Sequence, residues 1–108
     1  MKLNFNYKNM TILSYSSRRG LPPKPGIYYI GNSVCPVMYI GLSCNLKNRH
    51  RNHHRQAQFE NIENAVIRYR LLTDDLLAKN TDLGKVLRRL ERQAINHYKP
   101  LLNNTPIS

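Results

Sequence analysis

Apolar and polar residues follow a β-strand pattern in three segments of the chain. Residues 26–31 (Gly-Ile-Tyr-Tyr-Ile-Gly) and residues 37–41 (Val-Met-Tyr-Ile-Gly) are rich in β-branched and aromatic side chains, and the turn-like residues 32–36 separate them. This arrangement predicts a β-hairpin. Residues 65–72 alternate between apolar and polar side chains, which predicts a third strand.

The last third of the chain follows helical spacing instead. Leucine and alanine recur at three- and four-residue intervals over residues 83–95, and Thr81 or Asp82 can cap the helix that this spacing predicts. The helix must end before Pro100, because proline cannot continue it. We expect a short turn over residues 74–78 to precede it.

The N-terminal segment shows neither pattern. Residues 1–20 are polar and aperiodic and are predicted to form a basic arm, with at most a short strand at residues 11–13. Three prolines among residues 22–25 forbid a helix at the start of the following domain, residues 21–108. The order strand, strand, helix, strand, helix describes a small α+β domain.

Length and composition limit the class of protein. A chain of 108 residues with 41% apolar and 21% charged residues has room for one domain with a modest core. It contains no apolar run of the roughly 20 residues that a membrane span needs, and no signal peptide is apparent, so we expect a cytoplasmic protein without a membrane partner. Cys35 and Cys44 are then expected to be reduced thiols.

Charge is strongly positive and unevenly placed. Lys and Arg number 17 against 6 Asp and Glu, a net charge of +11. Residues 1–59 hold nine basic and no acidic side chains, whereas residues 60–108 hold eight basic and six acidic ones. A segregated excess of this size favours a polyanionic partner, and we expect nucleic acid rather than a lipid surface, because no basic helix with a broad apolar face is present.

The segment after the hairpin is the most basic part of the chain. Ser43 or Asn45 can cap a helix that continues to about Phe59, and no Asp or Glu follows four residues after its cations to neutralise them. Its basic and imidazole side chains are Lys47, Arg49, His50, Arg51, His53, His54 and Arg55. We expect the nucleic-acid contacts to come from Lys47, Arg51 and Arg55, with Arg18 and Arg19 of the arm.

One carboxylate interrupts the apolar stripe of the last helix. Leu87, Glu91 and Ile95 are spaced four residues apart, so Glu91 falls where a buried side chain is expected. Burying a carboxylate is costly unless it is paired or binds a metal. The two interpretations are an ion pair with Arg88 or Arg92 and a ligand for a hard divalent cation.

Tyrosine is the other surplus, with seven Tyr against two Phe and no Trp. Gly26-Ile27-Tyr28 and, after ten intervening residues, Tyr39-Ile40-Gly41 resemble the signature of the GIY-YIG nuclease family. The similarity continues through the positions that follow, which are Ser43, Leu46, Arg49, His53, Glu91, Pro100 and Asn103. Several motif positions in the right order make the resemblance specific.

The resemblance implies a fold and an activity. The fold is a three-stranded antiparallel sheet flanked by helices, and the activity is metal-dependent cleavage of DNA with Mg²⁺ or Mn²⁺. Tyr28 and Tyr39 would contact the attacking water and the scissile phosphate, and Glu91 would hold the metal. The remaining roles are phosphate binding by Arg49, assistance from His53, and bracing of the site by Asn103.

The hairpin pattern adds a test of the tyrosine assignment. Residues opposite one another in an antiparallel hairpin share a face, so Tyr28 and Tyr39 must point to the same side of the sheet if both serve the site. Tyr29 then faces the other side.

Other chemistries fit the residues less well. Cys35 and Cys44 with His50 and His54 could in principle bind zinc, but the cysteine spacing departs from that of zinc fingers. A serine–histidine acyl-transfer site would need an orienting carboxylate. The available acids Asp74, Asp75 and Asp82 fall in predicted turns.

Two other classes of protein compete with a DNA endonuclease. A non-cleaving nucleic-acid-binding module could keep the same fold, and a small basic scaffold protein would explain the charge but not Glu91. The presence of the whole tyrosine, arginine and glutamate set favours an enzyme. The chain is too short to hold a separate targeting module, so target choice would come from DNA structure, from the basic arm, or from a partner protein. The oligomeric state is open.

Overall fold

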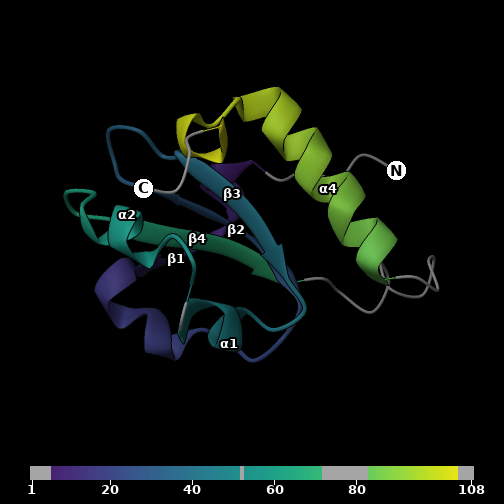
Figure 1. The fold of residues 1–108 in the computed structure, drawn as a ribbon, viewed down its shortest axis with the longest axis horizontal. Helices are drawn as coiled ribbons and strands as arrows, with labels where there is room; N and C mark the ends of the chain where they lie inside the picture. The colour runs from purple at the N-terminus through teal and green to yellow at the C-terminus, as the bar shows by residue number, and fades with distance from the viewer. Residues whose placement is uncertain (1–5, 52, 72–82, 105–108) are drawn as a thin grey trace.

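The computed structural model describes residues 6–51, 53–71 and 83–104. In chain order the elements, with η for 3₁₀ helices, are η1 (Tyr7–Asn9), β1 (Thr11–Ser14), η2 (Tyr15–Gly20), β2 (Gly26–Gly31), β3 (Tyr39–Ser43), α1 (Leu46–Arg51), α2 (Gln56–Glu60), β4 (Val66–Leu71), α4 (Leu83–Tyr98) and η3 (Leu101–Asn104). Figure 1 shows α4 beside β3 on one side of the sheet and the short α1 and α2 on the other. The fold is the α+β class that the sequence predicts.

The sheet has four strands rather than the predicted three. Its order is β1-β4-β2-β3, and each neighbouring pair is antiparallel. The added strand is β1, which lies where the sequence allowed at most a short strand and pairs Thr11 with Tyr69 and Ser14 with Val66. Its side chains are mostly exposed and show no alternation, so the strand exists because β4 offers it backbone partners. Part of the predicted basic arm therefore packs against the domain.

The predicted hairpin is confirmed. β2 matches residues 26–31, and β3 begins and ends two residues later than the pattern suggested, at Tyr39 and Ser43. The connecting turn is held by Asn32, whose side-chain oxygen accepts hydrogen bonds from the backbone N–H groups of Val34 and Cys35 at 3.0 and 2.8 Å. These bonds keep the residues before Tyr39 in the turn.

The single helix predicted to run to about Phe59 is wrong, because the chain forms two short helices, α1 and α2. Asn45 caps α1 by accepting a hydrogen bond from the backbone N–H of Asn48 at 3.0 Å. The helix ends before His53, whose ring Nδ1 accepts the backbone N–H of Arg55 at 2.9 Å. A side-chain acceptor thus takes a backbone donor that a continuing helix would use, and the chain turns so that His53 and Phe59 are both buried.

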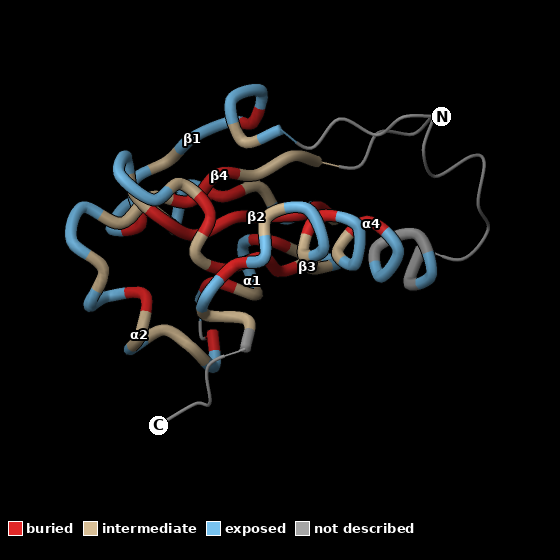
Figure 2. Tube along the Cα trace, turned by 90° about the horizontal axis from the view of Figure 1, so that it is seen from above, coloured by how far each residue is buried: buried red, intermediate tan, exposed pale blue. Residues whose placement is uncertain are grey.

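Each face of the sheet has its own core. On one face, Leu90 and Ala94 of α4 pack on Ile27, Tyr29 and Ile40. The other face is covered by η2, α1 and α2, and its buried residues are Tyr15, Leu21, Tyr28, Ile30, Tyr39, Leu46, Phe59 and Ile67. Figure 2 shows that β2 is buried along its length while β1 lies at the exposed edge. The central hairpin is therefore rigidly held on both faces.

The last helix begins at Leu83, as the leucine spacing predicts. The predicted caps Thr81 and Asp82 and the turn over residues 74–78 lie outside the described residues. Within the described residues, no helix is both long and apolar enough to cross a membrane.

Candidate active site

The two motif tyrosines share one face of the sheet, as the hairpin register requires. Tyr28 lies opposite Gly41 and Ile30 lies opposite Tyr39, so the Tyr28 and Tyr39 side chains point the same way. Their ring centroids are 6.2 Å apart. Tyr29 points to the opposite face, where its ring contacts that of Tyr98 at 5.4 Å. The register thus confirms that Tyr28 and Tyr39 share a face of the sheet and that Tyr29 points to the other.

Gly41 makes room for Tyr28. A Cβ atom at residue 41 would overlap both Cζ and Oη of Tyr28, because the ring crosses directly over this glycine. The last glycine of the second motif therefore has a steric reason to be present. It allows the Tyr28 hydroxyl to reach past β3 towards α1 and its neighbours.

We expect Gly41→Ala to displace the Tyr28 ring and to destabilise the fold by about 1–3 kcal/mol, the usual cost of overpacking. Thermal melting and a DNA cleavage assay would measure both effects. Gly20→Ala is the matched control, because a Cβ there meets only Leu13 Cδ2 at 3.9 Å. Equal behaviour of the two variants would contradict the steric role of Gly41.

His53 holds the Tyr28 hydroxyl at 2.7 Å through its Nε2 atom. The other ring nitrogen, Nδ1, accepts the backbone N–H of Arg55. Burial, with the charge of Arg49 and other neighbours, lowers the pKa of His53 to about 3, so the ring is neutral and carries one proton. That proton must be on Nε2, which therefore donates to Tyr28 Oη. The Tyr28 O–H is left to donate to another acceptor.

Burial raises the pKa of Tyr28 above its ordinary value, the neighbouring Tyr39 adds to the rise, and Arg49 opposes it. The Tyr28 hydroxyl is consequently protonated at neutral pH. In the folded chain it is a hydrogen-bond donor rather than a base.

Arg49 and Glu91 reach the same site from different elements. Arg49 lies half-buried on α1, with Nη2 at 2.9 Å from Nδ1 of His54. Glu91 lies half-buried on α4, where burial raises the pKa of its carboxyl and the charge of Arg49 opposes the rise. Glu91 also contributes to the raised pKa of Tyr28. The guanidinium, the carboxylate and the Tyr28 hydroxyl are therefore electrostatically coupled.

The alternative explanation of Glu91, an ion pair with Arg88 or Arg92, does not hold in the structure. Both arginines are exposed, and the ion pair found among the described residues joins Arg18 and Glu60 instead. The side chain of Leu87, the third member of the predicted stripe, is outside the described part. Glu91 is thus a partly desolvated carboxylate, and the charge of Arg49 opposes the effect of burial on its pKa.

Asn103 braces the edge of the sheet. Its side-chain oxygen accepts the backbone N–H of Ile40 and its Nδ2 donates to the Ile40 carbonyl, both at 2.8 Å. The amide therefore pairs with the outer edge of β3 as a neighbouring strand would. This pairing fixes the backbone between Tyr39 and Gly41.

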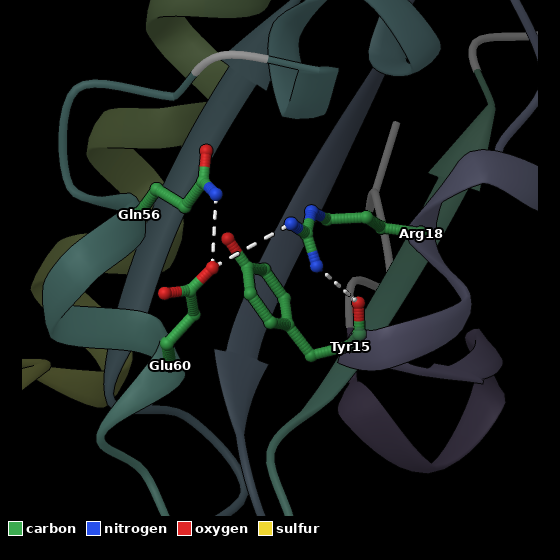
Figure 3. Close-up of polar contacts among 4 residues, drawn as sticks. All are labelled: Tyr15, Arg18, Gln56 and Glu60. Atoms are coloured by element: carbon green, nitrogen blue, oxygen red, sulfur yellow. Dashed lines mark hydrogen bonds and ion pairs between the residues drawn. The ribbon is translucent and has the colours of Figure 1, made fainter.

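The residues predicted to contact nucleic acid fall into two groups. Lys47, Arg51 and Arg19 are exposed. Arg55 lies over the Tyr39 ring at 5.3 Å, and its Nη1 donates to Gln58 at 2.8 Å. Arg18 donates to the Tyr15 carbonyl at 3.2 Å and lies 3.6 Å from Glu60 (Figure 3). Arg18 and Arg55 therefore help to hold the fold.

His50 is the residue of the site that sequence reasoning missed. It is fully buried, with its ring centroid 4.3 Å from that of Tyr28, and burial lowers its pKa to about 4. Helical periodicity gives no signal for this pair, because α1 ends at Arg51 and His53 reaches Tyr28 from beyond the helix.

The zinc and acyl-transfer alternatives gain no geometric support. Cys35 and Cys44 are exposed free thiols, and the described residues contain no group of three or more His, Cys, Asp or Glu that could hold a metal ion. The acids Asp74, Asp75 and Asp82 lie outside the described residues. A lone half-buried carboxylate still fits Mg²⁺ or Mn²⁺, since Mg²⁺ is commonly bound through one or two carboxylates with waters and substrate phosphate.

The buried histidines predict a pH dependence of stability. The unfolded chain takes up protons near pH 6.5, whereas His50 and His53 in the fold do so only near pH 4 and 3. Below pH 6.5 the unfolded chain therefore binds more protons than the folded chain, which favours unfolding. The free energy of unfolding is highest above pH 6.5 and decreases as the pH falls towards 4. We expect the melting temperature to drop between pH 7 and pH 5, with less of a drop for His50→Leu. The control is His97→Gln, because His97 is exposed. A melting temperature that does not change over this range would contradict the burial of His50 and His53 in their neutral form.

Comparison with known proteins defines the class. Residues 24–105 match the model of the GIY-YIG catalytic domain, so the chain belongs to the GIY-YIG family. Among relatives, it is 30% identical over 83 residues to the UvrABC system protein C of Pelodictyon phaeoclathratiforme and 28% identical over 85 residues to that of Clostridium acetobutylicum. These matches cover 77% and 79% of this chain but only 13% of each relative.

Solved structures share the fold. The N-terminal endonuclease domain of UvrC from Thermotoga maritima, bound to magnesium as its catalytic divalent cation, has a TM-score of 0.57 at 21% identity and covers 81% of this chain and 92% of that one. A point variant of the same domain, also with a divalent cation, has a TM-score of 0.59 at 18% identity, covering 95% of this chain and all of that one. The resemblance to the GIY-YIG family and the α+β fold class are confirmed, whereas the sheet has four strands instead of the predicted three.

Proposed function

We propose that this chain is a metal-dependent endonuclease that hydrolyses DNA phosphodiester bonds. The observation that carries the proposal is the convergence of Tyr28, Tyr39, Arg49, His53 and Glu91, which come from β2, β3, the α1 region and α4. Its structural neighbours are endonuclease domains, which supports the same conclusion at the level of the family.

Each side chain has a role that its surroundings favour. Tyr28, whose oxygen already accepts from His53, would donate its proton in a hydrogen bond to a non-bridging oxygen of the scissile phosphate. Tyr39 on the same face would orient the attacking water, and Arg49 would bind the phosphate with a planar pair of donors. His53 and Asn103 are positioning residues, because they hold Tyr28 and the backbone of β3.

Glu91 would hold Mg²⁺ or Mn²⁺, which when bound supplies Lewis-acid stabilisation of the charge that develops on the phosphate. The raised pKa of Glu91 is consistent with a carboxylate that gains from a cation nearby. The exposed cations Lys47, Arg51 and Arg19 would contact the DNA backbone on the same side as the tyrosines.

The direct test is cleavage of end-labelled duplex, branched and single-stranded DNA by the purified chain, with Mg²⁺, with Mn²⁺ and with EDTA. We expect cutting with either metal and none with EDTA. DNA binding without cutting in every condition would favour the alternative, a non-cleaving nucleic-acid-binding module with the same fold. The preferred DNA structure in this assay would also indicate how target sites are chosen.

DNA affinity is expected to depend steeply on salt, because residues 1–59 carry nine basic and no acidic side chains. The logarithm of the association constant should fall with the logarithm of salt concentration by about 0.9 for each phosphate contacted on duplex DNA. Fluorescence anisotropy between about 50 and 200 mM salt would measure the slope. An affinity that is constant over this range would show that residues 1–59 do not form the binding face.

A further inference from the structure

A cavity of about 500 Å³ lies between η2 and α1, beside the tyrosine site. Every described residue that lines it is basic or an imidazole, and these are Arg18, Arg19, Lys47, His50 and Arg51. Its volume is within the range of ordinary ligand pockets. The four permanent cations, with no carboxylate among the described lining residues, are suited to an anion of more than one negative charge or to a phosphate chain.

The cations at the opening are available to a ligand. The side chains of Arg19, Lys47 and Arg51 are exposed and make no hydrogen bond or ion pair within the part of the chain that is described. Arg18 is different, since Glu60 and the Tyr15 carbonyl hold its guanidinium (Figure 3). It is fixed in place as one wall of the cavity, and Glu60 itself lines a different cavity.

His50 links this cavity to the active site. Its ring is fully buried, lines the cavity, and packs edge-on against the Tyr28 ring at 4.3 Å. Both of its ring nitrogens lack a hydrogen-bond partner among the described residues. A neutral imidazole carries one N–H donor, and a buried donor without an acceptor is unfavourable. An anionic oxygen in the cavity would give His50 that acceptor.

Two of the residues that line the cavity precede the part of the chain that matches the family model. Arg18 and Arg19 belong to η2 and precede residue 24, where the match to the GIY-YIG model begins. The N-terminal segment of this chain therefore adds two cations next to the shared site.

We propose that this cavity binds a second phosphate group of the nucleic-acid substrate, a short distance along the strand from the phosphate at the tyrosine site. The proposal rests on the proposed function for the identity of the strand. Arg19, Lys47 and Arg51 bind the phosphate oxygens, Arg18 forms the fixed wall, and His50 donates a hydrogen bond from below. The shared wall at His50 makes the two phosphates neighbours on one strand. The second phosphate is either an internal phosphodiester or a terminal phosphate at a strand end.

The first experiment detects the site without DNA. Inorganic pyrophosphate is titrated against the chain at constant ionic strength while the imidazole ¹H signals are followed by NMR. We expect the His50 signals to shift with saturation, and the shift to disappear in Lys47→Ala/Arg51→Ala. Arg88→Ala/Arg92→Ala is the control, because it removes the same charge from the exposed side of α4 and should keep the shift. No movement of His50 in the wild type would overturn the proposal.

The second experiment measures DNA affinity in EDTA, where no cleavage is required. We expect Lys47→Ala/Arg51→Ala to bind duplex DNA about tenfold more weakly than Arg88→Ala/Arg92→Ala, with the salt slope lower by about one. Equal losses in the two double variants would overturn the proposal.

Duplexes with 5′-phosphate and with 5′-hydroxyl ends distinguish a terminal phosphate from an internal phosphodiester as the group that the cavity binds. A wild-type preference for the 5′-phosphate that the Lys47→Ala/Arg51→Ala variant loses assigns the site to a strand end. Equal loss on both duplexes assigns it to the internal backbone. A chain that shows this selective binding yet never cuts DNA with Mg²⁺ would overturn the proposed endonuclease and leave the phosphate site standing.

Discussion

Glu91→Gln is expected to reduce DNA cleavage in Mg²⁺ by about a thousandfold or more, which corresponds to about 4 kcal/mol of lost transition-state stabilisation. The amide keeps the shape and volume of the carboxyl but removes the charge that would hold the cation. The fold should be preserved, because Glu91 makes no ion pair with Arg88 or Arg92 and burial already disfavours its charged form. DNA affinity should stay the same or rise, since a negative charge near the phosphate is lost.

Cleavage, thermal melting and DNA binding should be measured on one preparation of Glu91→Gln. Glu63→Gln is the control, because Glu63 is an exposed carboxylate in the loop before β4 and its loss changes the net charge equally. Near-normal cutting by Glu91→Gln with Mg²⁺ would refute the proposed mechanism, whatever the family similarity implies.

Tyr28→Phe is expected to lower cleavage by about a hundredfold or more, the scale seen when one transition-state hydrogen-bond donor is removed. The phenylalanine keeps the ring over Gly41 and against His50, and it loses only the hydroxyl that His53 holds. Stability should fall by about 1–3 kcal/mol, because the Nε2–H of the buried His53 loses its acceptor.

Tyr29→Phe is the matched control for Tyr28→Phe, because the two residues are neighbours with the same side chain on opposite faces of the sheet. Tyr29 packs in the core beneath α4, so the change should lower the melting temperature slightly and leave cleavage within about threefold of the wild type. The reverse pattern, lost cleavage in Tyr29→Phe and normal cleavage in Tyr28→Phe, would show that the active face of the sheet is the one beneath α4.

The sequence predicts the central hairpin, and the side of the sheet to which each tyrosine points, because both depend on short-range geometry. Side chains alternate along a strand, so the spacing of Tyr28 and Tyr39 across a short turn leaves few registers that bring both to one face. Likewise, four-residue spacing on a helix is enough to place Glu91 in line with Ile95 beside the core. These features follow from local sterics, which the residues themselves determine.

Long-range contacts decided two features that local patterns did not predict, the fourth strand of the sheet and the break in the basic helix. β1 has no strand periodicity of its own and became the fourth strand because β4 had an unpaired edge. The predicted helix to about Phe59 was broken at His53, since the ring takes the Arg55 backbone donor and reaches Tyr28 only from outside a regular helix.

The sequence gives the net charge of the chain but does not show which cations are paired in the fold. From composition alone, Arg18 and Arg19 were equivalent, yet Glu60 and Tyr15 hold Arg18 while Arg19 is exposed. The sequence by itself determined which chemical groups are present, the hairpin that carries the tyrosines, and the excess of positive charge. The tertiary structure alone decided which cations face a common cavity and which are neutralised. Those choices depend on contacts between segments far apart in the chain, and local periodicity does not encode such contacts.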